Sequence, residues 1–174
     1  EPASSMIFCN TREETRQVYA FLAGKGLPAA MLSSDLTQRK REQVMARFRS
    51  GAIRHLATTD VASRGIDIMD LSHVFIFSTP ESPEQYIHRA GRTGRVGKSG
   101  RAISLISAMD LMNFNRLVKR YHIDVRELPV PTDEKDGKPT RNLGLRIYTG
   151  LPGGLPTAED AAKVKEHGIE ADIR

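Results

Sequence analysis

The stretch that decides the fold reads YIHRAGRTGR at residues 86–95, and it is interpreted together with TTDVASRGIDI at residues 58–68. The first stretch places three arginines and a histidine within eight positions, interrupted by two glycines. Arg92 and Arg95 are three residues apart, so both guanidiniums leave the same face of a helical turn. Permanently charged, forked donors of this kind suit a polyphosphate. Taken alone, the stretch fits a solvated basic helix end equally well, and the second stretch decides between the two interpretations.

The two stretches, in this order and about twenty residues apart, resemble motifs V and VI of the DEAD-box RNA helicases. SMIFCNT at residues 5–11 resembles motif IV of that family. LTQRKREQVMARFRSG at residues 36–51 resembles the family's segment with a Gln-x-x-Arg pair followed by Phe and Gly. The resemblance covers roughly residues 4–128, with four motifs in the right order and spacing. It implies the C-terminal RecA-like domain of such a helicase.

Alternating strand and helix patterns agree with this fold. Short apolar runs predict strands, and amphipathic runs bounded by capping residues or glycines predict helices. The expected strands are Met6–Cys9, Ala29–Leu32, His55–Thr58, Val74–Phe77 and Ala102–Ile106, with a candidate edge strand at Val125–Leu128, and the expected helices are Glu13–Lys25, Thr37–Arg49, Pro83–Ala90 and Asp110–Tyr121. Repeated strand–helix units predict an α/β fold, a mostly parallel sheet with helices on both faces and ligands at the carboxyl ends of the strands.

The character of the chain changes after residue 128. We expect a RecA-like helicase domain over residues 1–128 and a linker with a C-terminal extension over residues 129–174. The extension holds a candidate strand at Leu143–Tyr148 and a candidate helix at Thr157–His167, and its role stays open.

Charge is spread unevenly along the chain. Residues 1–132 hold 19 Lys and Arg against 13 Asp and Glu, whereas residues 133–174 hold 7 against 8. The basic surplus therefore belongs to the part with the motifs, as a nucleic-acid-binding surface requires. An aromatic content of 6% without Trp favours contacts to the sugar–phosphate backbone over base stacking.

The resemblance implies nucleotide-binding roles for the residues of motifs V and VI. In the family, two RecA-like domains close around ATP and a single strand of RNA, and the second domain supplies arginine fingers. By motif position, Arg92 and Arg95 would take this catalytic role at the γ-phosphate, with His88 bridging toward the partner domain. Asp67 would accept a hydrogen bond from the ribose, next to Gly65. Mg²⁺ would be held mainly by the N-terminal domain, because this chain has neither a P-loop nor a DEAD box.

RNA would run across the face formed by the strand ends, where hydroxyls, arginines and backbone N–H groups donate to phosphates. The resemblance implies these RNA contacts for Thr11, Gln38, Arg41, Thr59, Arg64 and Gly65. The first turns of a helix, where Gln38 and Arg41 are expected, favour anions. Arg89 is a weaker candidate with a structural role, and Phe8 would pack either under the motif VI arginines or in the core.

Two departures from the family pattern lie at strand ends. Ser33-Ser34 stands where His-Gly is common, and Ile76-Phe77-Ser78 stands where Asn-Tyr-Asp is common. Coupling or the grip on RNA can be altered at these positions. Gly97-Lys98-Ser99 resembles the end of a P-loop but lacks the required glycine five residues earlier, so we interpret it as a turn. No CxxC, HExxH or GxSxG occurs, and we expect no metal site.

These observations predict the C-terminal half of an ATP-dependent RNA helicase that is inactive as an ATP hydrolase by itself. Its expected partners are RNA and the N-terminal RecA-like domain of the same protein, and we expect a monomer. A DNA helicase half from the same superfamily and a non-enzymatic RNA- or protein-binding module on the same fold stay open as alternatives.

The apolar runs bear on the compartment. None of them approaches the ~20 residues that span a bilayer, so we expect no membrane contact. The single cysteine, Cys9, lies in an apolar run and predicts a buried, inert thiol in a reducing, intracellular compartment. The cytoplasm is our first expectation, and the nucleus and organelles stay open.

Overall fold

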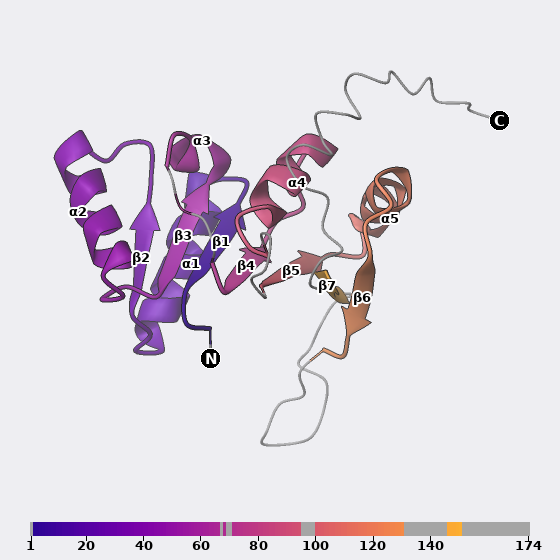
Figure 1. The fold of residues 1–174 in the computed structure, drawn as a ribbon, viewed down its shortest axis with the longest axis horizontal. Helices are drawn as coiled ribbons and strands as arrows, with labels where there is room; N and C mark the ends of the chain where they lie inside the picture. Colours follow the sequence, from indigo (N-terminus) through magenta and orange to yellow (C-terminus); the bar gives the residue numbers. More distant parts are fainter. Residues whose placement is uncertain (1, 67, 69–70, 95–99, 131–145, 151–174) are drawn as a thin grey trace.

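The computed structural model describes residues 2–66, 68, 71–94, 100–130 and 146–150 (Figure 1). Strands and helices alternate along most of this range. In chain order the elements are β1 (Ser5–Cys9), α1 (Arg12–Gly24), β2 (Ala29–Leu32), α2 (Gln38–Arg49), β3 (His55–Thr59), α3 (Asp60–Ser63), β4 (His73–Ile76), α4 (Pro83–Ala90), β5 (Arg101–Ile106), α5 (Leu111–Arg120), β6 (Val125–Leu128) and β7 (Arg146–Gly150).

The strands form a mixed sheet with the order β2-β3-β1-β4-β5-β7-β6. Strands β1 to β5 pair in parallel, whereas β7 runs antiparallel to both β5 and β6. β6 lies at the edge, as its sequence predicted. The mostly parallel α/β sheet expected from the sequence is therefore confirmed.

Right-handed crossovers decide which face of the sheet each helix covers. The chain moves from β1 to β2 in one direction along the sheet and from β2 to β3 in the other, so α1 and α2 lie on opposite faces. The step from β4 to β5 has the same direction as the step from β2 to β3, which puts α4 on the face of α2. Helices therefore cover both faces of the sheet, as predicted.

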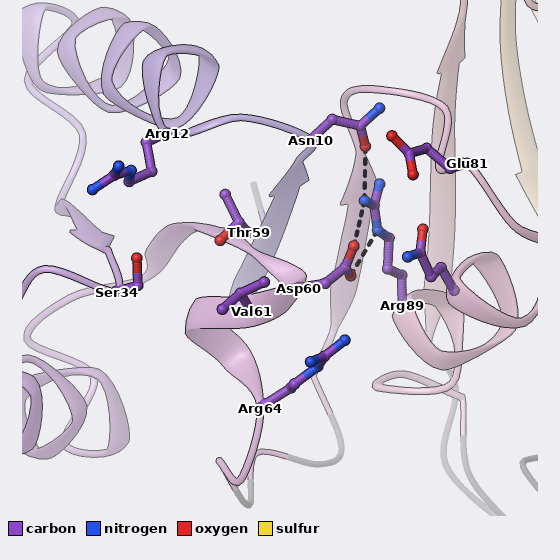
Figure 2. A pocket seen from close by; sticks show the side chains of 10 residues that line it. Asn10, Arg12, Ser34, Thr59, Asp60, Val61, Arg64, Glu81 and Arg89 are labelled. Carbon is purple, nitrogen blue, oxygen red and sulfur yellow. Dashed lines mark hydrogen bonds and ion pairs between the residues drawn. The ribbon is translucent and has the colours of Figure 1, made fainter.

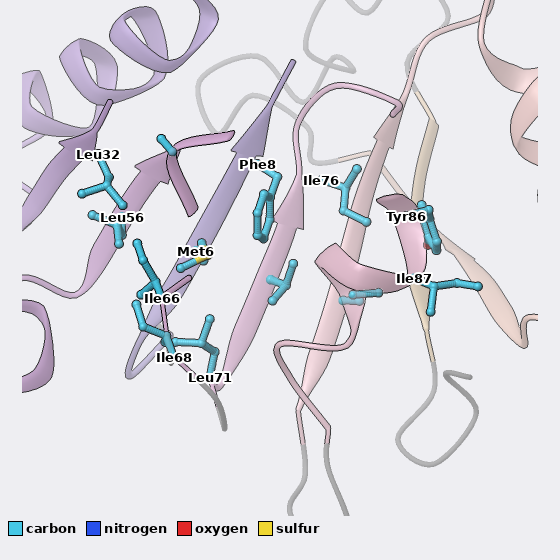
Figure 3. Packing of buried hydrophobic residues seen from close by; sticks show 14 of the residues in the cluster. Met6, Phe8, Leu32, Leu56, Ile66, Ile68, Leu71, Ile76, Tyr86 and Ile87 are labelled. Atoms are coloured by element: carbon cyan, nitrogen blue, oxygen red, sulfur yellow. The ribbon is translucent and has the colours of Figure 1, made fainter. Parts of the chain in front are cut away.

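The core lies between the sheet and helices α2, α4 and α5, and its part beneath α4 is shown in Figure 3. Met6 and Phe8 from β1 and Ile76 from β4 are at most 2% exposed. Tyr86 on α4 is also buried, and its hydroxyl lies 3.0 Å from the Ser104 hydroxyl on β5. This packing fixes α4, and with it the start of motif VI, against the sheet.

Strand β7 comes from the part of the chain expected to be an extension. A strand was predicted at residues 143–148, and the structure has it at Arg146–Gly150, inserted between β5 and β6. The helix predicted at residues 157–167 lies outside the described residues. The division at residue 128 stays a prediction, and β7 from beyond it takes part in the same sheet.

Candidate nucleic-acid and nucleotide interface

The side chain of Arg89 ties together the segments that follow three neighbouring strands (Figure 2). Its Nε and Nη2 donate to the two carboxylate oxygens of Asp60, after β3, at 2.9 and 2.7 Å. Nη1 donates to the carbonyl oxygen of Ser78, after β4, at 2.8 Å, and Nη2 donates to Oδ1 of Asn10, after β1, at 2.8 Å. The guanidinium also lies over the Phe8 ring, 5.6 Å from its centroid.

This network gives Arg89 a structural role. The residue is 1% exposed, and its charge is compensated by the bidentate pair with Asp60. A buried charge without such a partner would be strongly destabilising. The network therefore holds motifs IV, V and VI in one fixed arrangement through Asn10, Asp60 and Arg89. Phe8 both packs against the Arg89 guanidinium and belongs to the core.

A cleft of about 410 Å³ opens at the carboxyl ends of the strands, over this network. Its lining joins α1, β2, motif V and α4, and the residues are Asn10, Arg12, Ser34, Thr59, Asp60, Val61, Arg64, Glu81, Gln85 and Arg89. Of the residues predicted to bind RNA, Thr59 and Arg64 line it. Arg64 is exposed, whereas Thr59 is buried.

Hydrogen bonds from Thr59 and Arg41 fix the conformation of the motif V loop. The Thr59 hydroxyl oxygen accepts a hydrogen bond from the Ala62 N–H at 3.3 Å and caps α3. Nη2 of Arg41 donates to the carbonyl oxygens of Ala62 and Arg64 at 2.6 and 3.1 Å. Gly65 has a φ of +70°, which a side chain would strain. Arg41 therefore supports the loop that presents Arg64.

Thr11 and Gln38 are exposed but do not line the cleft. The Thr11 hydroxyl oxygen accepts from the Glu14 N–H at 3.1 Å, and the Glu14 carboxylate accepts from the Thr11 N–H at 3.0 Å. This capping box starts α1 and leaves the Thr11 hydroxyl proton available for donation. Nε2 of Gln38 donates to the Glu42 carboxylate at 2.7 Å, one turn along α2.

The described part of motif VI borders a second, smaller cleft. This cleft has about 100 Å³ and is lined by Phe8, Asp60, Ser63, Arg64, Gln85, His88, Arg89 and Arg92. His88 is exposed, and Nη1 of Arg92 donates to the Ile66 carbonyl at 3.1 Å, which ties motif VI to motif V. Asp67 and Arg95 lie outside the described residues.

One departure from the family pattern lies at the cleft over the Arg89–Asp60 pair. Ser34 lines it, and the neighbouring Ser33 hydroxyl donates to the Asp35 carboxylate. This hydrogen bond is the main reason that the pKa of Asp35 is below its usual value. The second departure includes Ser78, whose carbonyl binds Arg89.

Burial raises the pKa of the Cys9 thiol to about 11, so the thiolate that reagents attack is scarce at neutral pH. Among the described residues, no group of three or more His, Cys, Asp or Glu side chains is placed to hold a metal ion. In the same part of the chain, no helix is both long and apolar enough to cross a membrane.

Sequence interpretation missed several residues that the structure brings to the cleft. Asn10 and Asp60 directly follow β1 and β3, and Glu81 lies in the connection from β4 to α4, whereas Ser34, two residues after β2, is one of the departures already noted in the sequence. Their position after parallel strands is the available signal, because the carboxyl ends of such strands meet at one edge of the sheet.

The model of the family described as helicase conserved C-terminal domain matches residues 1–97. Among the relatives, ATP-dependent RNA helicase RhlB of Pseudomonas aeruginosa is 47% identical over 86 residues, which cover 49% of this chain and 22% of the relative. Eukaryotic initiation factor 4A of Cryptosporidium parvum is 36% identical over 126 residues, which cover 72% of this chain and 31% of the relative. The chain therefore spans less than a third of the length of these two relatives.

A solved structure of the Escherichia coli DEAD-box protein SrmB, bound to regulator of ribonuclease activity A, superposes with a TM-score of 0.67. Its sequence is 35% identical, and the match covers 82% of both chains. The C-terminal domain of the DEAD-box protein Dbp5 matches with a TM-score of 0.63 and 34% identity, over 70% of this chain and 71% of the other. The motifs, the sheet and these matches agree, and the chain belongs to the helicase conserved C-terminal domain family as the C-terminal RecA-like domain of a DEAD-box helicase.

Proposed function

We propose that this chain is the C-terminal half of an ATP-dependent RNA helicase, which grips the RNA backbone and completes the site for ATP held by an N-terminal RecA-like domain. The names of the RhlB relatives, ATP-dependent RNA helicases, support this proposal. The observation that carries it is the convergence at one sheet edge: Asn10, Asp60 and Arg89, from the ends of β1, β3 and α4, hold one network under an open cleft.

The RNA backbone would bind along the rim of this cleft and the neighbouring loops. Arg64 supplies an exposed guanidinium, and the hydroxyls of Thr11 and Thr59 accept from backbone N–H groups while keeping their own protons for phosphates. Gly65 permits a close approach to the backbone. Gln38 would extend the contact with RNA along α2, together with the N–H groups of Arg41 that bind no carbonyl. Arg41 also positions the motif V loop by donating to the carbonyl oxygens of Ala62 and Arg64.

ATP would be met on the motif VI side. When bound, ATP supplies the anhydride bond whose hydrolysis drives remodelling of the RNA. Arg92 and Arg95 would place their charge at the γ-phosphate, with His88 toward the partner domain. The bond from Arg92 to the Ile66 carbonyl supports this, because Ile66 lies between Gly65 and Asp67, the residues proposed beside the nucleotide. Mg²⁺ would be bound mainly by the N-terminal domain.

The RNA grip is tested by Arg64→Ala, measured as the affinity of the chain for several unrelated single-stranded RNAs over a range of salt concentrations. Affinity should fall by a similar factor for every sequence, and the salt slope should decrease by about one counterion, because a phosphate contact carries no sequence information. Arg16→Ala is the matched control, since Arg16 is exposed, pairs with Glu13 and does not line the cleft.

A loss confined to one RNA sequence would show that bases are being read, and an unchanged affinity would refute the RNA grip at this cleft. The same preparation should release no phosphate from ATP when RNA is present, because the chain lacks a P-loop. Competition by single-stranded DNA separates the RNA helicase from the DNA helicase alternative.

A further inference from the structure

The cleft over the Arg89–Asp60 pair has two sides of different chemistry (Figure 2). On one side lie Arg12, at the start of α1, and Ser34, after β2, while Arg64, at the end of α3, lies between the two sides, below Asp60 in the view. On the other side lie Asn10 and Glu81. Gln85 of α4, four residues after Glu81, also lines the cleft. One side is therefore cationic, and the other carries a carboxylate and an amide.

The charged groups at the bottom of the cleft are already paired. Asp60 and Arg89 neutralise each other through two hydrogen bonds. The charges left at the rim belong to the side chains of Arg12, Arg64 and Glu81, all exposed and none of them in a side-chain hydrogen bond or ion pair with another described residue. These three side chains are therefore available to a ligand.

The loop that carries Glu81 is held rigidly. Pro80 and Pro83 restrict the backbone on either side, and Ser82 between them caps α4 through the Gln85 N–H. Nδ2 of Asn10 donates to the Thr79 carbonyl at 2.7 Å and fastens the loop to the end of β1. A carboxylate on such a loop loses little conformational freedom when it binds a ligand.

A nucleic-acid strand in this cleft would direct its phosphates to Arg12 and Arg64, away from Glu81. A carboxylate cannot face a phosphate favourably, and it accepts hydrogen bonds but donates none. The ribose 2′-hydroxyl is the donor in the sugar–phosphate backbone of RNA that DNA lacks. We propose that Glu81, assisted by Gln85, accepts the hydrogen bond of a ribose 2′-hydroxyl and makes this cleft select RNA over DNA. The proposal rests on the RNA grip proposed above.

The test compares an oligouridine with the oligodeoxyuridine of the same length, bound to the 174-residue chain at low salt. Glu81→Ala should lower the preference for RNA over DNA by about tenfold, as expected for one charge-assisted hydrogen bond. The ratio is the readout, because removing a negative charge strengthens the binding of both strands alike. Glu13→Gln is the matched control, since it removes one exposed carboxylate away from the cleft and should leave the ratio unchanged.

A 2′-fluoro oligouridine sharpens the assignment, because its sugar keeps the conformation of RNA but has no hydroxyl proton. The unaltered chain should bind it as weakly as DNA, and Glu81→Ala should bind all three strands alike. If Glu81→Ala leaves the ratio of RNA affinity to DNA affinity unchanged while Arg64→Ala still weakens RNA binding, the proposed role of Glu81 is wrong. The proposed function is not contradicted by that result. If the chain binds none of the strands, the proposed binding of the RNA backbone at this cleft is wrong, and so is the role of Glu81.

Discussion

Polar residues lie at both ends of the parallel strands, but the cavities beside them differ. Charged and polar side chains line the cleft at the carboxyl ends, whereas Ser5 and His55 at the amino ends border a cavity lined mainly by apolar side chains. At the amino ends, Ser5, His55, His73 and Arg101 lie in one register row across β3, β1, β4 and β5. Here side chains on adjacent strands pair with each other, as in the 2.9 Å hydrogen bond between the Ser5 hydroxyl and His55 Nδ1. At the carboxyl ends, Asn10, Asp60 and Ser78 all bind one arginine that comes from a helix.

The difference follows from the topology of the sheet. At the carboxyl ends the chain leaves neighbouring strands toward helices on opposite faces, and a crevice forms where the connections diverge. Similar residue types therefore build one connected hydrogen-bond network under a cleft at one end of the strands and separate side-chain pairs at the other. The predictions below test this contrast.

Arg89→Ala should have the largest effect on stability, because it removes every bond of the network and leaves Asp60 without its partner. We expect a loss of ~3–5 kcal/mol in the free energy of unfolding, measured by urea denaturation. Arg64→Ala, an exposed arginine at the same edge, is the control and should stay within ~0.5 kcal/mol of the unaltered chain. Similar losses for the two variants would mean that the buried network is no more important for folding than the rim.

Asn10→Ala should have an intermediate effect, because Asn10 both accepts from Arg89 and donates to Thr79. We expect a loss of ~1–3 kcal/mol in urea denaturation. Asn10→Asp keeps the acceptor for Arg89 and should recover part of the loss, whereas Ser34→Ala on the same cleft should cost little. If Asn10→Asp is as unstable as Asn10→Ala, the bond to the Glu81 loop is the more important of the two.

His73 at the amino ends should give the smallest effect, as a dependence of stability on pH. Burial, and then the nearby Arg101, hold the pKa of His73 below the ordinary value of 6.5. The unfolded chain therefore binds this proton more readily, so the stability from neutral His73 is fully present above about pH 6.5 and is lost as the pH falls below it. Urea midpoints at about pH 7.5 and about pH 5 measure this loss, which His73→Gln should reduce. A loss of the same size in that variant would assign the pH dependence to another group.

Several elements could be predicted from the sequence with the bounds that the structure has. Ala29–Leu32, Pro83–Ala90 and Val125–Leu128 all agree. Their signals are local: an apolar run, a proline at the first helical position after a capping serine, and a short run near a polar linker. Helix α1 begins one residue before its prediction, because Thr11 caps it.

The position of β7 could not be predicted in this way. Its sequence indicates a strand, but its insertion between β5 and β6 depends on pairing with β5, whose residues lie forty or more positions earlier in the chain. Only the folded sheet decides between which strands a late strand pairs, because backbone hydrogen bonding between strands carries little sequence information.

The sequence by itself determined the family, the order of the motifs and the residue types at the strand ends, because motif spacing and hydrophobic period are local properties of the chain. Only the tertiary structure decided that Arg89 is buried and donates four hydrogen bonds while Arg64 is exposed on the rim of the cleft. Both are arginines within motifs, and their roles differ because Arg89 meets Asp60 and Asn10, 29 and 79 residues away in the chain. Such distant partners are brought together by sheet register and helix packing, which no local pattern specifies.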